Sequence, residues 1–207
     1  MYRYSIRIRD LFKDLPEHLS WLIAVFMLIN VFGGFYYIKK DLLIGLIYVI
    51  AVLIGFIFHE LGHRMVSRKL GCSARFTIDL FSVIVTGFIG VIQNLYLLLH
   101  ATSLPLIFAL PGYVLSICSF STLSFEGAIS SAGPSVNIMI SIATFIMMKI
   151  FPEYSLFLKI ISEVNIILAL FNLIPIPPLD GYKIIRWNLI IWLLLVTISL
   201  IILMSIR

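Results

Sequence analysis

Long apolar runs, separated by short polar or proline-rich stretches, set the pattern along this chain. A helix of about 20 apolar residues is long enough to cross a bilayer. The runs predict membrane spans near residues 21–38, 42–69, 80–99, 135–150, 156–173 and 187–204. Gly71 favours a stop for the second helix, because glycine readily adopts the left-handed backbone that ends a helix. We therefore expect an all-α polytopic membrane protein.

One stretch after the second span departs from this pattern. The residues at 73–79 are typical of a short strand, and GYVLSI at 112–117 predicts a second one. Prolines break the apolar stretch at 104–120, which predicts a return or re-entrant segment, and the small polar residues at 119–135 predict a loop. If that loop lies on the same side of the membrane as residue 70, an even number of crossings separates them. The expected total is five to seven transmembrane helices, of which six fits this parity least.

The composition excludes an ordinary soluble domain. The 207 residues are 61% hydrophobic and 12% charged, whereas soluble domains carry about 25% charged residues. Basic residues flank the first two spans, and such flanks prefer the cytoplasmic side. They are Arg3, Arg7, Arg9, Lys13, Arg64, Arg68 and Lys69. No basic stretch is interleaved with aromatic residues, so the net charge of +5 predicts no nucleic-acid partner.

Cys72 and Cys118 are expected to be free thiols, because their spacing matches no metal or disulfide pattern. No short apolar run with a small-residue cleavage site follows the basic start, so we expect no cleavable signal peptide. The small size and the lack of a eukaryotic sorting signal favour a multi-pass protein of a prokaryotic plasma membrane. The chain is expected to form one domain over residues 1–207.

The candidate chemistry lies in FHELGH, at residues 58–63. His59 and His63 are four residues apart, which turns a helix by about 400° and places both imidazoles on one face. Zinc held by such a pair lowers the pKa of a water, and Glu60 beside it can take the proton and pass it to a leaving amine. Ionisable residues at membrane depth are costly and mark functional sites. The motif therefore predicts one zinc ion.

A catalytic zinc usually has three protein ligands, so a further ligand is needed. His18 and His100 lie before the first span and at a hairpin tip, where ordinary surface roles are expected. Glu163 follows Lys159 by one helical turn, which predicts a local ion pair. Asp180 stands where three prolines break an apolar helix, and the rigid loop presents its carboxylate toward the membrane interior. The alternative for Asp180 is a cap on the helix that follows.

Three motifs, HELGH, AGPSVN and FNLIPIPPLDG, resemble those of the site-2 protease family of intramembrane zinc metalloproteases, over residues 42–185. The resemblance implies a compact form without PDZ or CBS modules. It implies that His59, His63 and Asp180 bind one zinc ion and that Glu60 activates water. It also implies that the substrate is bound by Gly133, Pro134, Asn137 and Asn172, with Asn137 holding the substrate backbone. In many members a proline follows the last of these asparagines, whereas here it is Leu173.

The implied activity is zinc metalloendopeptidase cleavage of a membrane protein in or near its transmembrane segment, as in regulated intramembrane proteolysis. The expected partners are that substrate and the lipid bilayer, with the active site toward the cytoplasm and the oligomeric state open. An unwound substrate is expected to pair with the edge of the strand at 112–117, unless that strand is only structural. One alternative is another membrane zinc protease, such as a prenyl-protein processing enzyme, with Glu163 or Glu126 as third ligand. The other is a transporter or a zinc-binding membrane scaffold without proteolytic activity.

Overall fold

The computed structural model describes residues 15–100, 112–118 and 122–206. Its elements are α2 (Glu17–Val31), α3 (Gly34–Lys40), α4 (Leu42–Lys69), β1 (Ser73–Thr77), α5 (Leu80–His100), β2 (Tyr113–Ile117), α6 (Leu123–Ile150), the 3-10 turn η1 (Pro152–Tyr154), α7 (Ser155–Asn172), α8 (Asp180–Trp187) and α9 (Leu189–Ile206). Within these residues α4, α5, α6, α7 and α9 are long and apolar enough to cross a membrane, and the pair α2–α3 adds a sixth, bent span. The all-α polytopic class is confirmed. The parity expectation depends on residues 101–111, which lie outside the described ranges.

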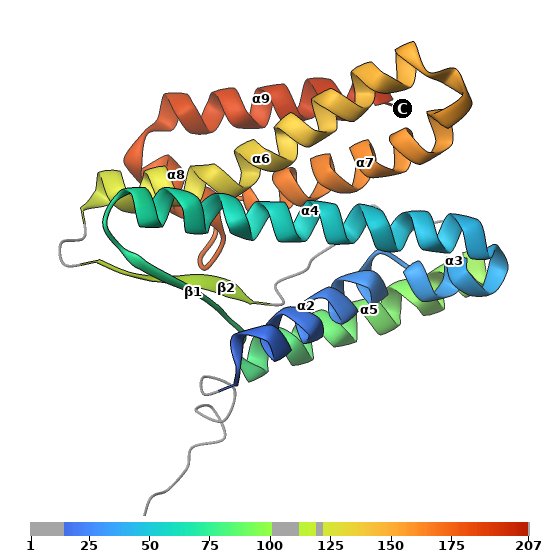
Figure 1. The fold of residues 1–207 in the computed structure, drawn as a ribbon, viewed down its shortest axis with the longest axis horizontal. Helices are drawn as coiled ribbons and strands as arrows, with labels where there is room; N and C mark the ends of the chain where they lie inside the picture. Colours follow the sequence, from blue (N-terminus) through green and yellow to red (C-terminus); the bar gives the residue numbers. More distant parts are fainter. Residues whose placement is uncertain (1–14, 101–111, 119–121, 207) are drawn as a thin grey trace, which may run out of the picture.

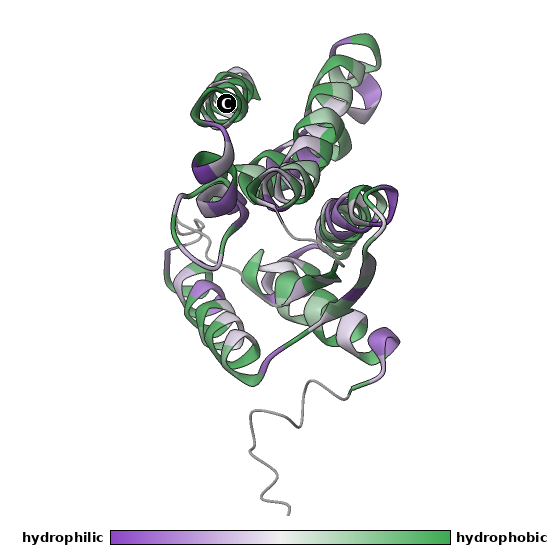
Figure 2. Ribbon diagram, turned by 90° about the vertical axis from the view of Figure 1, so that its left-hand side faces the viewer, coloured by the Kyte–Doolittle hydropathy of each residue, from purple (hydrophilic) through white to green (hydrophobic). Residues whose placement is uncertain are grey.

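Helix α4 runs between two groups of helices (Figure 1). On one side it packs against α6 and α7, and together with α8 and α9 these three helices form the group that we call the catalytic bundle. On the other side lie α2 and α5, which we call the lateral pair. The outer faces of the helices are largely hydrophobic (Figure 2). Exposed examples are Leu46, Phe88, Ile146 and Ile201. These faces fit a lipid surrounding.

The bounds predicted for the second span match those of α4. Asp41 caps its start, because the side chain accepts a hydrogen bond from the backbone N–H of Ile44 at 3.1 Å. Gly71 follows its end with a positive φ of 77°, a conformation that glycine adopts without a Cβ clash. The helix therefore ends within reach of β1, and the histidine motif lies in its second half.

The first predicted span is not one straight helix, because α2 and α3 meet at a bend of 63°. Gly33 has a φ of 72° there, and a Cβ at this position would lie 2.3 Å from Leu97 Cδ1. Asn94 of α5 holds the bend: its amide nitrogen donates to the Asn30 carbonyl at 2.8 Å, and its oxygen accepts from the Tyr36 backbone N–H at 3.2 Å. The glycine pair in VFGGF was the signal for this break.

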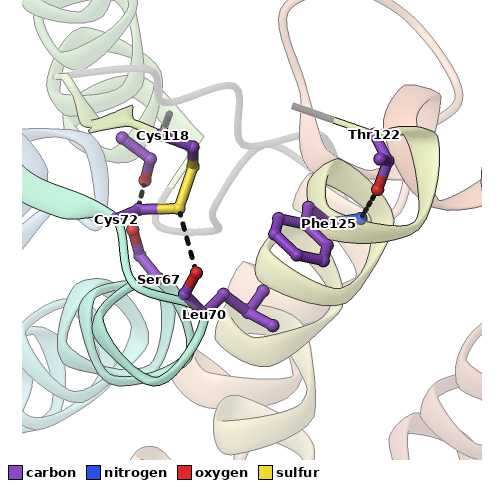
Figure 3. Close-up of a disulfide and its surroundings, with 7 residues drawn as sticks. Ser67, Leu70, Cys72, Cys118, Thr122 and Phe125 are labelled. Atoms are coloured by element: carbon purple, nitrogen blue, oxygen red, sulfur yellow. Dashed lines mark hydrogen bonds between the residues drawn. A yellow bond between two sulfur atoms is a disulfide. The ribbon is translucent and has the colours of Figure 1, made fainter. Parts of the chain in front are cut away.

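Helix α6 begins at Leu123, well inside the segment that the sequence predicts as a loop. Thr122 caps it by accepting from the Phe125 backbone N–H at 3.2 Å (Figure 3). Gly133 and Pro134 consequently lie inside a helix and not at its start. Small residues such as these let neighbouring helices approach closely in a membrane. Close packing against those helices then stabilises the helical form of this segment.

Strands β1 and β2 form an antiparallel pair in which Ser73 lies opposite Ile117. Both strands were predicted, but the free thiols were not correct: Cys72 and Cys118 form a disulfide just beyond that residue pair (Figure 3). Ser67 of α4 also donates to Ser116 of β2 at 3.0 Å. The end of the histidine helix is thus tied to β2 by a covalent bond and by a hydrogen bond.

Glu17 anchors β1 on the side of the lateral pair. Its carboxylate accepts from the Trp21 indole at 3.3 Å and from the Phe76 backbone N–H at 3.1 Å, and it pairs with Arg64 of α4. Phe76 is fully buried and packs against Trp21, with ring centroids 4.6 Å apart and the ring planes tilted by 35°. The small sheet is therefore fixed between the lateral pair and the catalytic bundle.

Candidate metal centre

Helices α4 and α8 bring three potential metal ligands together, next to the start of α6 (Figure 1). The Nε2 atoms of His59 and His63 are 3.0 Å apart. The Oδ2 atom of Asp180 lies 3.4 Å from the first and 3.1 Å from the second. Within the described part of the chain this is the group of histidine, cysteine and acidic side chains placed to hold a metal.

These distances fit one zinc ion. Tetrahedral zinc, with ligands about 2.0 to 2.1 Å away, holds neighbouring ligand atoms roughly 3.3 to 3.4 Å apart. The Nδ1 atom of His63 lies 2.7 Å from the carbonyl oxygen of Ile129, which only accepts hydrogen bonds, so this nitrogen carries the proton and Nε2 offers its lone pair. Buried lone pairs that face one another at such distances are costly, and a cation between them would satisfy all three.

Gly133 leaves the space that the ion needs. A Cβ at this position of α6 would lie 2.4 Å from His63 Nε2 and 2.6 Å from His59 Nε2. Both contacts are far below van der Waals distance, so the glycine of AGPSVN borders the metal site directly. Its neighbour Pro134 is buried within α6.

The proline-rich segment delivers Asp180 as the sequence suggests. Leu179 is extended, with φ −63° and ψ 156°, and α8 begins at the aspartate. A Cβ at Gly181 would lie 2.1 Å from the Leu173 carbonyl oxygen, so this close approach needs glycine. The N-cap position of α8 is Leu179, and Asp180 is the first residue inside the helix, which argues against the alternative of a helix cap.

The electrostatics of Asp180 agree with a ligand role. Burial raises the pKa of its carboxyl, but protonated imidazoles at His63 and His59 outweigh burial and hold that pKa below its ordinary range. A bound zinc ion would take the place of those protons as the neighbouring positive charge. The group is therefore a carboxylate throughout the neutral range, which is the form that binds a metal.

A cavity of about 440 Å³ opens beside the three ligands. Glu60 lines it, and its buried Oε2 atom has no hydrogen-bond partner within the described residues. A buried carboxylate oxygen without a partner is costly, which fits a group that bonds a bound molecule. The remaining wall includes Tyr113 and Val114 of β2, Gly112 directly before that strand, Asn172 of α7, and the charged residues Asp79, Glu126, Lys183 and Arg186.

The asparagines predicted to bind substrate differ in their placement. Asn172 lines the cavity and donates to the Leu168 carbonyl at 3.0 Å. Asn137 is fully buried, and its Oδ1 atom lies 2.5 Å from His59 Nδ1. Asn165, which was not among the candidates, contacts it from α7. No motif marks Asn165, but an asparagine within an apolar span was a signal of a polar contact there.

The other candidate ligands lie elsewhere or in different roles. Glu163 pairs with Lys159 at 3.8 Å, as predicted. His100 lies at the far end of α5, where Nδ1 contacts the Tyr96 carbonyl at 3.3 Å. Glu126 lines the cavity but does not belong to the ligand group.

Comparison with known proteins agrees with this donor set. The chain is 39% identical over 161 residues to "Putative zinc metalloprotease MJ0611" of Methanocaldococcus jannaschii, which covers 76% of this chain and 78% of that protein. The chain belongs to this family of zinc metalloproteases. "Putative zinc metalloprotease YwhC" of Bacillus subtilis is 34% identical over 70 residues, or 28% of this chain and 32% of that protein. No family model and no solved structure matches.

Membership in the zinc metalloprotease family gives the ligand group its context. A helical HExxH pair, a distant carboxylate and apolar spans together define a membrane zinc metalloprotease. Its zinc site is built from side chains of the bundle itself, since both histidines are only 5% and 6% exposed.

Proposed function

We propose that the chain is an intramembrane zinc metalloendopeptidase of the site-2 protease type, which cleaves a membrane protein in or near a transmembrane segment. The observation that carries the proposal is the position of the ligand group. His59 and His63 belong to a candidate membrane span, and the cavity beside them is walled by a strand. A substrate that reaches this cavity through the bilayer must be a membrane-embedded chain.

Glu60 is the proposed general base and acid. It accepts a proton from the attacking water as the new C–O bond forms, and it donates that proton to the leaving nitrogen as the C–N bond breaks. Zinc, when bound, supplies Lewis-acid polarisation of the carbonyl and a water of lowered pKa. The partnerless Oε2 atom of Glu60 supports this role, because its hydrogen-bonding capacity is available to the water.

Strand β2 is the proposed docking edge for the substrate. A peptide bond inside a helix is shielded by its own backbone hydrogen bonds, so the substrate must unwind before cleavage. In the described sheet β1 occupies one edge of β2, and residues from the start of β2 line the cavity. An unwound segment added at the other edge would satisfy its backbone groups and lie along the cavity.

The proposed orientation places this end of the bundle toward the cytoplasm of a prokaryotic cell. Basic residues cluster where α4 ends and on α8, and such clusters prefer the cytoplasmic side. They are Arg64, Arg68, Lys69, Lys183 and Arg186. At the opposite end α3 carries only Lys39 and Lys40.

The test combines metal analysis with cleavage of a panel of single-span substrates by the protein in lipid nanodiscs. The Glu60→Gln variant should keep its zinc and lose about 10²- to 10⁴-fold in cleavage rate. Glu126→Gln, which changes another acid of the same cavity, should keep both. Full activity of Glu60→Gln would refute the assignment of the base. Zinc without cleavage of any substrate would favour a transporter or scaffold, and loss of zinc in Glu126→Gln would favour another protease class.

A further inference from the structure

A chain of buried amides runs behind His59 and joins three helices. Asn137 of α6 contacts His59 of α4 at 2.5 Å, and its amide nitrogen donates to the Gly55 carbonyl and to Asn165 Oδ1, both at 2.9 Å. Asn165 of α7 donates in turn to the Ile161 carbonyl at 2.8 Å. Both asparagines are fully buried. The chain therefore ends on backbone at one side and on a metal ligand at the other.

The hydrogen bonds leave one consistent set of amide orientations. Asn165 must direct its NH₂ group to the Ile161 carbonyl, so its oxygen faces Asn137. Asn137 has two N–H bonds, and the Gly55 carbonyl and this oxygen use both. A flipped Asn137 would place its oxygen against two other acceptors in a fully buried position, which is costly.

The orientation of Asn137 decides which nitrogen of His59 carries the proton. Its Oδ1 atom only accepts, so the facing Nδ1 atom of His59 must donate. The other ring nitrogen, Nε2, then holds the lone pair that points to His63 and Asp180. We infer that Asn137 and Asn165 are positioning residues, which fix the tautomer and ring orientation of His59 for the metal rather than bind substrate.

This hydrogen-bonded relay, from Asn165 through Asn137 to His59, depends on a close approach of α4 to α7. A Cβ at Gly55 would lie 2.8 Å from Leu168 Cδ1 and 3.3 Å from Asn165 Oδ1. His63 needs no such relay, because a backbone carbonyl of α6 fixes its Nδ1 atom. One ligand is therefore held by backbone, and the other by side chains that substitution can change.

The test measures zinc affinity by chelator competition and the His59 tautomer by ¹⁵N NMR of the metal-free, histidine-labelled protein. Asn137→Leu should weaken zinc binding by about 10- to 100-fold, the range for lost outer-shell partners. It should also let the His59 proton occupy either ring nitrogen. Asn137→Asp keeps an acceptor for His59 and should keep the proton on Nδ1, but its second oxygen faces the Gly55 carbonyl and Asn165 Oδ1, so it should restore the zinc affinity only in part. Asn165→Leu should give a smaller loss, because it removes only the support of Asn137.

Ser141→Ala is the matched control. Ser141 and Ser162 are also fully buried between α6 and α7, with their hydroxyl oxygens 2.9 Å apart, but they do not contact His59. This variant should bind zinc as the wild type does. Equal zinc affinities of Asn137→Leu and Ser141→Ala would overturn the inference, as would a wild-type His59 with its proton on Nε2. The inference rests on the proposed zinc site, but both readouts are independent of proteolysis.

Discussion

Two asparagine pairs lie between helices of this protein, one in the lateral pair and one in the catalytic bundle. The Asn94 amide nitrogen lies 2.8 Å from the Asn30 carbonyl, 2.7 Å from Asn30 Oδ1 and 2.8 Å from the Gly90 carbonyl, so these three acceptors share its two N–H bonds. Its oxygen accepts from the Tyr36 backbone N–H. All of these partners belong to α2, α3 and α5, and none of them is a candidate metal ligand. The bonds of the Asn137 pair instead lead to an imidazole whose second nitrogen faces other metal ligands. Buried amides alone therefore do not indicate a functional site; the end point of their hydrogen bonds does.

The surroundings of the two pairs differ as well. In the apolar part of the span that contains α7, 56% of the residues are buried, whereas only 22% are buried in the apolar part of α5. The Asn137–Asn165 pair is consequently packed by protein on several sides, whereas the Asn30–Asn94 pair mainly holds a bend next to lipid. We expect substitutions in the bundle to alter metal binding and substitutions in the lateral pair to alter stability.

Among the proposed substitutions in the catalytic bundle, Asp180→Ala is expected to lower zinc affinity the most. Removing a direct ligand leaves two imidazoles, so zinc affinity should fall by more than about 100-fold, beyond the range typical of outer-shell changes. Metal content and chelator competition on the purified variant measure this effect.

Asp79→Ala is the control for Asp180→Ala, because Asp79 lines the same cavity but bonds the Ser82 backbone N–H at 3.0 Å at the start of α5. It should keep its zinc. Unchanged zinc in Asp180→Ala would remove this residue from the ligand set and redirect the search to Glu126.

The sequence predicted the ligand group because each part carries its own local signal. The spacing of His59 and His63 follows from helix geometry, and the bounds of α4 are marked by a capping aspartate and by Gly71. Asp180 could be selected because three prolines end the preceding helix beside it. None of these signals needs knowledge of a distant contact.

The features that the sequence did not predict depend on long-range packing. The Cys72–Cys118 disulfide joins residues 46 positions apart, and spacing alone does not give such a pairing. The first turns of α6 contain serine and glycine, and packing against neighbouring helices outweighs their weak helix propensity. Asn137 was assigned to substrate from its motif, whereas its hydrogen bonds are visible only once α4, α6 and α7 are assembled.

A smaller loss of zinc affinity is expected from Gly133→Ala, and Gly87→Ala is its control. Gly133→Ala places a Cβ against both Nε2 atoms, and the rings cannot retreat easily because Asn137 and the Ile129 carbonyl hold them. Zinc affinity should fall by about 10- to 100-fold, as for other changes that disturb ligand orientation. A Cβ at Gly87 of α5 would meet only the flexible Met27 side chain, with Sδ at 3.4 Å and Cε at 3.8 Å, so Gly87→Ala should leave zinc affinity unchanged. Equal affinities of both variants would show that α6 does not border the metal.

The smallest effect, and the most direct check on the contrast, is expected from Asn94→Leu. The change removes the acceptor for the Tyr36 N–H and the donor for the Asn30 carbonyl. The free energy of unfolding should fall by about 1 kcal/mol, the usual scale for a lost interhelical hydrogen bond in a membrane. Zinc affinity should not change, because none of these bonds leads to His59. Chemical unfolding in detergent and chelator competition measure the two quantities on one sample. A loss of zinc affinity in Asn94→Leu as large as that of Asn137→Leu would show that the two regions are coupled through α4, and the functional distinction between the two asparagine pairs would then fail.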